Sequence, residues 1–109
     1  MGTTKTDFFT ENQNQTALLF KALAHPARIA IIEHLVKVNS CICNDIVNEI
    51  PLAQATISQH LKELKSAGII KGNIEGTKIC YCLNELAIEK LSIYIDLIRT
   101  QNVNRFNCC

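Results

Sequence analysis

The chain has 109 residues, of which 48% are hydrophobic and 19% charged, and its formal net charge is +1. This composition predicts one folded domain, because it is far from that of disordered chains and no apolar run approaches the ~18 residues that a membrane span needs. A net charge so close to zero does not by itself indicate a nucleic-acid partner, so any DNA-binding face must be a local patch.

The beginning of the chain lacks the apolar core of a secretion signal, and we expect a cytoplasmic protein with no membrane partner. Its six cysteines are then expected to be reduced thiols that bind metals or sense oxidants. They form three close pairs: Cys41 with Cys43, Cys80 with Cys82, and Cys108 with Cys109. None has the Cys-x-x-Cys spacing of thioredoxin-like enzymes or common zinc knuckles, which argues against both classes.

Two helices are predicted in the first third of the chain, after a loose polar arm at residues 1–12. Residues 13–24 should form a helix with one buried face, because Ala17, Leu18, Phe20 and Leu23 recur at helical spacing. Pro26 is tolerated in the first turn of a second helix that runs to Val38 with Ile29, Ile32, Leu35 and Val36. We expect His25 and His34 to have surface or capping roles, since neither has a neighbour at metal-ligand spacing.

A helix-turn-helix is predicted next. Residues 41–43 alternate like a short strand, residues 44–49 form a short helix that Pro51 ends, and residues 53–66 form a second helix closed by Gly68. On this second helix Ile57, Leu61 and Leu64 point inward. The outward side chains are small or form hydrogen bonds, which suits contact with base edges in DNA. The predicted DNA-binding residues are Gln54, Ala55, Thr56, Ser58, Gln59, Lys62 and, on the following hairpin, Lys78.

Other charged residues are candidates for phosphate contacts, namely Arg28, Lys65 and Lys71, whereas His60 is expected to pack at the inner edge of its helix. Residues 69–83 read as a β-hairpin, or wing, with a loop over residues 73–78. On its second strand Ile79, Tyr81 and Leu83 share one face. The other face then displays the thiols of Cys80 and Cys82 side by side.

The last helix, residues 84–100, is apolar nearly all round, so it needs cover from two sides. One domain of this size does not supply both covers, which predicts a two-fold homodimer. The predicted dimerisation residues are Leu86, Leu91, Tyr94, Ile95 and Ile98. The expected fold is α+β and mainly helical: a winged helix-turn-helix domain over residues 13–101 with a flexible tail at 102–109.

Three segments together resemble the ArsR/SmtB family of bacterial metal-responsive repressors. They are residues 23–29 (LAHPARI), residues 41–46 (CICNDI), and residues 56–64 (TISQHLKEL) followed by residues 67–70 (AGII). The resemblance covers about residues 15–100. It implies a winged helix dimer, paired through its first and last helices, that binds double-stranded operator DNA and is released by its ligand.

The resemblance also implies that Cys41 and Cys43 bind arsenite or antimonite, with cadmium or lead as alternatives and no organic cofactor. Ile46 stands where some arsenic sensors have a third cysteine, so another thiol must complete the site. In winged helix domains the strand before the helix-turn-helix lies beside the second wing strand, which brings Cys80 and Cys82 next to Cys41 and Cys43. The tail cysteines, Cys108 and Cys109, are the competing donors.

The sequence differs from the family pattern at two further places. The last helix lacks the paired Asp/His and His/Glu ligands of the family's zinc sites, and Ala53 stands where a capping serine is common.

Two other functions remain open. One is a thiol redox or persulfide sensor on the same fold. The other is a small thiol enzyme or metallochaperone, which is disfavoured because no histidine lies near a Cys-x-Cys in the sequence. We therefore expect a transcriptional repressor and not an enzyme.

Overall fold

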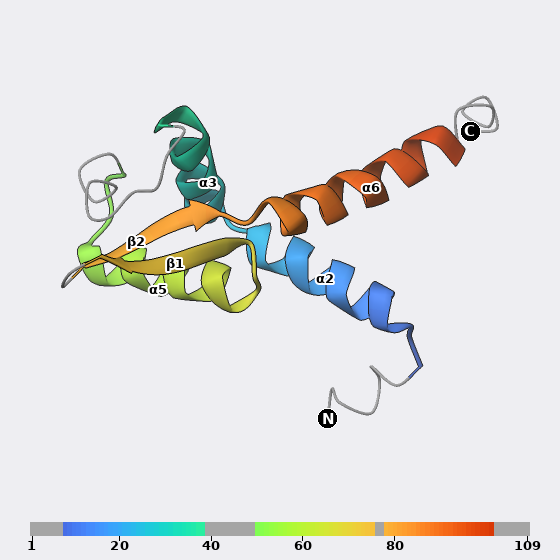
Figure 1. The fold of residues 1–109 in the computed structure, drawn as a ribbon, viewed down its shortest axis with the longest axis horizontal. Helices are drawn as coiled ribbons and strands as arrows, with labels where there is room; N and C mark the ends of the chain where they lie inside the picture. The colour runs from blue at the N-terminus through green and yellow to red at the C-terminus, as the bar shows by residue number, and fades with distance from the viewer. Residues whose placement is uncertain (1–7, 39–49, 76–77, 102–109) are drawn as a thin grey trace.

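A computed structural model describes residues 8–38, 50–75 and 78–101 (Figure 1). Within these ranges the elements are α2 (Glu11–Leu23), α3 (Pro26–Val38), α5 (Gln54–Ser66), β1 (Ile70–Glu75), β2 (Lys78–Leu83) and α6 (Glu85–Gln101). The predicted strand at 41–43 and helix at 44–49 lie outside the described residues. Helices and a small antiparallel hairpin follow each other in the predicted order, which agrees with an α+β winged helix-turn-helix.

Helix α2 begins at Glu11, two positions before the predicted start, because Thr10 forms a capping box with Gln13. The Thr10 hydroxyl accepts a hydrogen bond from the Gln13 backbone N–H at 3.0 Å, and the Gln13 side chain accepts one from the Thr10 N–H at 3.0 Å. The buried face of α2 also differs from the expected one, as it consists of Thr16, Leu19 and Ala22. Leu18 and Phe20, which were expected on the buried face, are exposed instead.

Helix α3 begins at Pro26, as predicted, and His25 caps it. The His25 Nδ1 accepts a hydrogen bond from the Ala27 backbone N–H at 3.0 Å, which confirms a capping role for this histidine. Ile31 and Leu35 are the buried residues of the helix. Ile29 and Val36, which the periodicity placed on the inner face, are exposed.

Helix α5 carries the inner face that its sequence predicted: Ile57, Leu61 and Leu64 are all buried. Its N-cap, Ala53, makes no side-chain capping hydrogen bond, as expected from the missing serine. Gly68 has a φ of +85°, and the Ile69 N–H donates to the Leu64 carbonyl at 3.0 Å. These are the features of a Schellman motif, which turns the chain from α5 directly into the β-hairpin.

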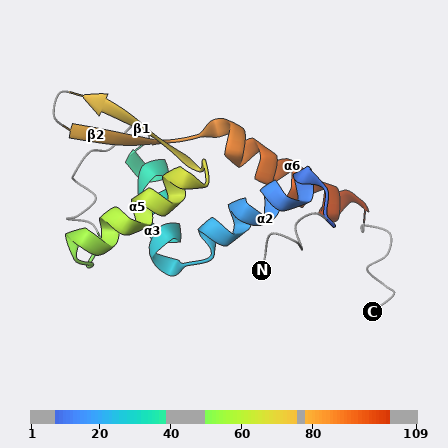
Figure 2. The same cartoon turned by 90° about the horizontal axis from the view of Figure 1, so that it is seen from below.

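Strands β1 and β2 form a two-stranded antiparallel sheet whose register runs from Ile70 opposite Leu83 to Glu75 opposite Lys78. The strands extend further than expected, since residues 73–75 continue β1 and leave only residues 76–77 between the paired ends. Figure 2 shows the hairpin lying over α5. Ile69 and Ile70 are buried against this helix, and Tyr81 and Leu83 pack on the same core from β2.

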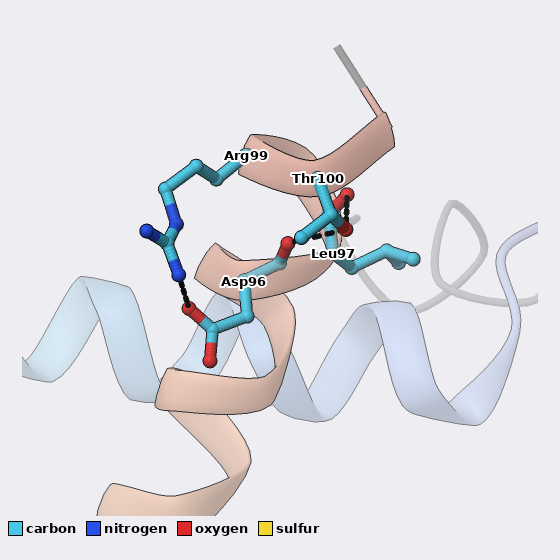
Figure 3. Close-up of polar contacts among 4 residues, drawn as sticks. All are labelled: Asp96, Leu97, Arg99 and Thr100. Carbon is cyan, nitrogen blue, oxygen red and sulfur yellow. Dashed lines mark hydrogen bonds and ion pairs between the residues drawn. The ribbon is translucent and has the colours of Figure 1, made fainter. Parts of the chain in front are cut away.

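Helices α2 and α6 lie side by side and extend away from the body formed by α3, α5 and the hairpin (Figures 1 and 2). The rings of Phe20 and Tyr94 meet edge to face across them, with centroids 5.8 Å apart. Near the end of α6, Asp96 accepts a hydrogen bond from Arg99 at 3.1 Å, and the Thr100 hydroxyl donates to the Asp96 carbonyl at 2.8 Å (Figure 3). None of the described helices is long and apolar enough to span a membrane.

Only two side chains of α6, those of Ala87 and Leu91, are buried. Leu91, one of the predicted dimerisation residues, belongs to the core of its own chain. The other four of that set, Leu86, Tyr94, Ile95 and Ile98, are exposed. Ile88, Ile93 and Leu97 are exposed as well. The described part of one chain therefore covers α6 from one side, as its all-round apolar sequence predicted.

Candidate DNA-binding face and cysteine cluster

The outer face of α5 is exposed in the described part of the chain and presents short side chains at its N-terminal half. The exposed residues include every predicted DNA-binding position on this helix: Gln54, Ala55, Thr56, Ser58, Gln59 and Lys62. Small and hydrogen-bonding side chains allow a helix to approach base edges closely, and a lysine can contact a phosphate. Lys71 is exposed on β1, whereas the side chain of Lys78 on β2 lies outside the described part.

An unpredicted hydrogen bond orients one of these side chains. The Gln59 Nε2 donates to the Glu63 carboxylate at 3.1 Å, one helical turn away. This contact leaves the Gln59 carbonyl oxygen and one N–H free, which is the donor and acceptor pair that glutamine uses to bind adenine. The i, i+4 spacing of Gln59 and Glu63 was a visible signal for the pair.

His60 holds α5 against α3 through Arg28. The Arg28 Nε donates to the His60 Nδ1 at 3.1 Å, and the Arg28 Nη1 donates to the Ala22 carbonyl at 3.2 Å. The rings of His25 and His60 lie 4.4 Å apart between centroids. The packing role expected for His60 is confirmed. Arg28 was expected to contact phosphate, but its guanidinium instead joins α2, α3 and α5.

The environment of His60 favours its neutral form. Burial lowers the pKa of His60 below its ordinary value of 6.5, and the nearby charges of His25 and Arg28 lower it further, while Glu63 acts in the opposite direction. A neutral ring is also what the contact with Arg28 requires, because Nδ1 must keep a lone pair to accept that hydrogen bond. The His60 Nδ1 is therefore an unprotonated acceptor at neutral pH.

The two wing cysteines depart from the expected pair of displayed, reduced thiols. Cys80 is only 2% exposed, whereas Cys82 is partly exposed, and both are disulfide-bonded in the structure. Cys80 lies opposite Asn73 and Cys82 opposite Lys71 in the regular register of the hairpin, so the two cysteines share one face of β2. The other cysteines, Cys41, Cys43, Cys108 and Cys109, lie outside the described residues.

Within residues 8–38, 50–75 and 78–101, no three His, Cys, Asp or Glu side chains come close enough to hold a metal ion. Cys80 and Cys82 place two sulfur atoms on one face of β2. In the reduced form, cysteine sulfur suits soft, thiophilic ions better than hard cations.

Comparison with known proteins supports the assignment of a helix-turn-helix to this chain. A family model described as "Bacterial regulatory protein, arsR family" matches residues 25–71, from the cap of α3 to the start of β1. The chain is 36% identical over 87 residues to an uncharacterized HTH-type transcriptional regulator of Methanocaldococcus jannaschii, which covers 79% of this chain and 97% of that protein. These matches include the whole recognition helix.

A second relative is a homolog of the cadmium resistance transcriptional regulatory protein CadC from Staphylococcus aureus, 35% identical over 88 residues, 80% of this chain and 72% of that protein. An ArsR-like transcriptional regulator from Rhodococcus sp. RHA1 has the same fold, with a TM-score of 0.76 at 19% identity over 91% of this chain and 92% of that one. The chain thus belongs to the ArsR/SmtB family of helix-turn-helix transcriptional regulators, and its fold is a winged helix.

Proposed function

We propose that this protein is a repressor that binds double-stranded operator DNA as a homodimer and leaves it when a thiophilic ion binds its cysteines. The exposed, slender outer face of α5 carries this proposal. Its inner face is fixed by buried Ile57, Leu61 and Leu64, and by the bond between Arg28 and His60, so the outer face is held rigidly. A rigid helix with short polar side chains fits the major groove of duplex DNA.

The DNA-binding face is tested by fluorescence anisotropy of a labelled operator fragment from the upstream region of the protein's own gene. Gln59→Ala is expected to weaken specific binding by about 1–3 kcal/mol, and Lys62→Ala to reduce the salt dependence by about one phosphate contact. Gln101→Ala changes the last residue of α6, a helix that extends away from α5 in Figure 1; it is the matched control and should bind normally. Equal affinities of Gln59→Ala and the control would reject α5 as the reading helix.

The exposed apolar surface along α2 and α6 supports the homodimer. Leu18 is 59% exposed, Leu97 53% and Ile98 42%, and apolar residues so exposed along two adjacent helices favour association with a second copy. We expect Ile98→Asp to shift the sedimentation profile from dimer to monomer. Ser92→Asp, the same substitution on the polar stripe of α6, should leave the dimer intact. A monomeric wild-type protein at micromolar concentration would reject this assembly.

The inducer is proposed to be trivalent arsenic, with cadmium or lead as the other candidates, bound by Cys41 and Cys43 together with Cys80 or Cys82. Thiolates prefer such soft ions to hard cations, and the related CadC homolog is named for cadmium resistance. The position of Cys80 and Cys82 on one face of β2 supports their participation. When bound, the ion would cross-link these thiolates. Strand β2, which carries Cys80 and Cys82, would transmit the resulting strain.

Release is tested with fully reduced protein on labelled operator DNA, titrated with arsenite and separately with cadmium chloride. The double variants Cys41→Ser/Cys43→Ser and Cys80→Ser/Cys82→Ser are expected to bind DNA but to lose at least tenfold in sensitivity to the ion. Cys108→Ser/Cys109→Ser is the matched control and is expected to respond like the wild type. Wild-type release that persists in both wing and Cys41/Cys43 variants would reject this site.

A further inference from the structure

A cavity of about 700 Å³ lies where the end of α2, the turn into α3 and the C-terminal half of α5 meet. Its volume is typical of small-molecule sites, whereas the cavities beside α6 hold only about 200 to 280 Å³. We propose that this cavity binds a small organic anion, a carboxylate with an apolar body, which draws Arg28 away from His60 and so loosens α5. The binding site goes beyond the proposed function, and its effect on DNA rests on that function.

The polar groups that line this cavity are mostly hydrogen-bond donors. Lys21, His25 and Arg28 lie on its wall together with the hydroxyl of Ser66. Glu63 is the one acidic side chain among the lining residues, and its carboxylate already accepts a hydrogen bond at 3.1 Å from a side chain on α5. An excess of cationic donors over acceptors favours a ligand that carries negative charge.

Several of these donors remain for a ligand. Arg28 uses two of its five N–H groups, one to the His60 Nδ1 and one to the Ala22 carbonyl. The Lys21 ammonium has no ion-pair partner in the part of the chain that the structure describes. Because the His25 Nδ1 accepts a backbone N–H of α3, the ring proton is on Nε2, which is a further donor. A carboxylate in the cavity can therefore accept hydrogen bonds from three side chains.

The remaining wall of the cavity is apolar and made of small side chains. It includes Ala22, Ala24 and Ala67, whose single methyl groups leave the space that a ligand can fill. An apolar ligand body is stabilised there because it leaves water. Inorganic phosphate has a suitable charge but no apolar surface, so we expect it to bind less tightly than an organic carboxylate.

The cavity adjoins the contact that fixes α5 to the rest of the fold. The Arg28 Nε donates to the His60 Nδ1 at 3.1 Å, and His60 is a neutral acceptor. A carboxylate accepts stronger hydrogen bonds from a guanidinium than a neutral ring does, and it can bind two N–H groups at once. A bound carboxylate thus competes with His60 for Arg28. Loss of this bond removes a link between α3 and α5.

Binding is tested by NMR of the imidazole nitrogens, because the chain has only three histidines. Sodium benzoate is the probe, titrated at constant ionic strength, and we expect a Kd of about 1–10 mM for a fragment of this size. The signals of His25 and His60 should move, whereas that of His34, which does not line the cavity, should stay. Benzamide has the same shape without the charge and should move none of them. Unmoved signals, an equal response to benzamide, or an equal affinity for inorganic phosphate would overturn the site.

Substitutions of opposite sign test the role of charge. Lys21→Gln is expected to weaken benzoate binding about threefold to fivefold, since the ammonium is exposed. Glu63→Gln removes the acidic group and should strengthen binding. Lys37→Gln changes an exposed lysine of α3 that does not line the cavity, and it should bind like the wild type. Equal affinities of Lys21→Gln and Lys37→Gln would contradict the assigned ligand class.

Operator binding with and without benzoate tests the effect on α5. At saturating benzoate the wild type should lose at least about fivefold in operator affinity, and benzamide should have no effect. An unchanged operator affinity in protein whose His25 and His60 signals respond would overturn the link to α5. Failure of the proposed function looks different: both histidines respond to benzoate, but the protein binds operator DNA neither with benzoate nor without it.

Discussion

Replacement of Arg28 by alanine is expected to loosen the recognition helix from the rest of the fold. The guanidinium makes two part-buried hydrogen bonds, to the His60 Nδ1 at 3.1 Å and to the Ala22 carbonyl at 3.2 Å. Each is worth about 1 kcal/mol, so Arg28→Ala should lower the free energy of unfolding by about 2 kcal/mol. For a domain of this size that corresponds to a fall of about 10 °C in Tm.

Urea unfolding at a fixed protein concentration measures this loss, since the stability of the proposed dimer would depend on concentration. Arg99→Ala is the matched control, because Arg99 pairs with Asp96 where both side chains are more than half exposed, at 72% and 55%. Such a surface pair contributes less than about 1 kcal/mol. The reasoning is refuted if Arg28→Ala costs no more than Arg99→Ala, or if Arg28→Ala costs the same when His60 has already been replaced by alanine.

Three further predictions concern stability. The pKa of His60 is lowered on folding, so the unfolded state binds the proton more readily; stability should be full above the ordinary value of 6.5 and fall as the pH drops below it. Urea midpoints measured from about pH 7.5 to about 5.5 should show a smaller decline in His60→Gln than in the wild type. Leu64→Ala empties a fully buried site and should cost about 2–5 kcal/mol by denaturant unfolding, and a cost below about 1 kcal/mol would contradict the assigned core. Gly68→Ala meets no atom within 4 Å but must keep a φ of +85°, so calorimetry should show a loss of about 1 kcal/mol that Gly68→Asn partly restores.

Sequence patterns predicted those features of the fold that depend on residues close to one another in the chain. The inner face of α5 followed from helical periodicity, and the end of this helix from the glycine at position 68, whose φ is positive in the structure. The Thr10 capping box was also visible in the sequence, as a threonine three residues before a glutamine, and was missed. In each case the signal lies within a few residues.

Contacts between distant residues were not predictable in this way. Arg28 and His60 are separated by 32 positions, and no spacing rule links them, so Arg28 read as a surface phosphate contact. Helix α6 is apolar on nearly every side, so its periodicity did not show that Leu91 rather than Leu86 faces the core of its own chain. Which face meets which neighbour is decided by tertiary packing.

The β-hairpin, α5 and α6 meet at one junction, which gives the proposed sensor a route from sulfur to DNA. The Asn84 side chain donates to the Gly68 carbonyl at 2.8 Å, and the Asn84 backbone N–H donates to the Ile69 carbonyl at 2.9 Å. These bonds tie the end of β2 and the start of α6 to the end of α5. Under the proposed function, ligation at Cys80 and Cys82 acts on β2 only a few residues from this junction. A coupling free energy of about 1–3 kcal/mol between ion binding and DNA binding is enough for an allosteric response.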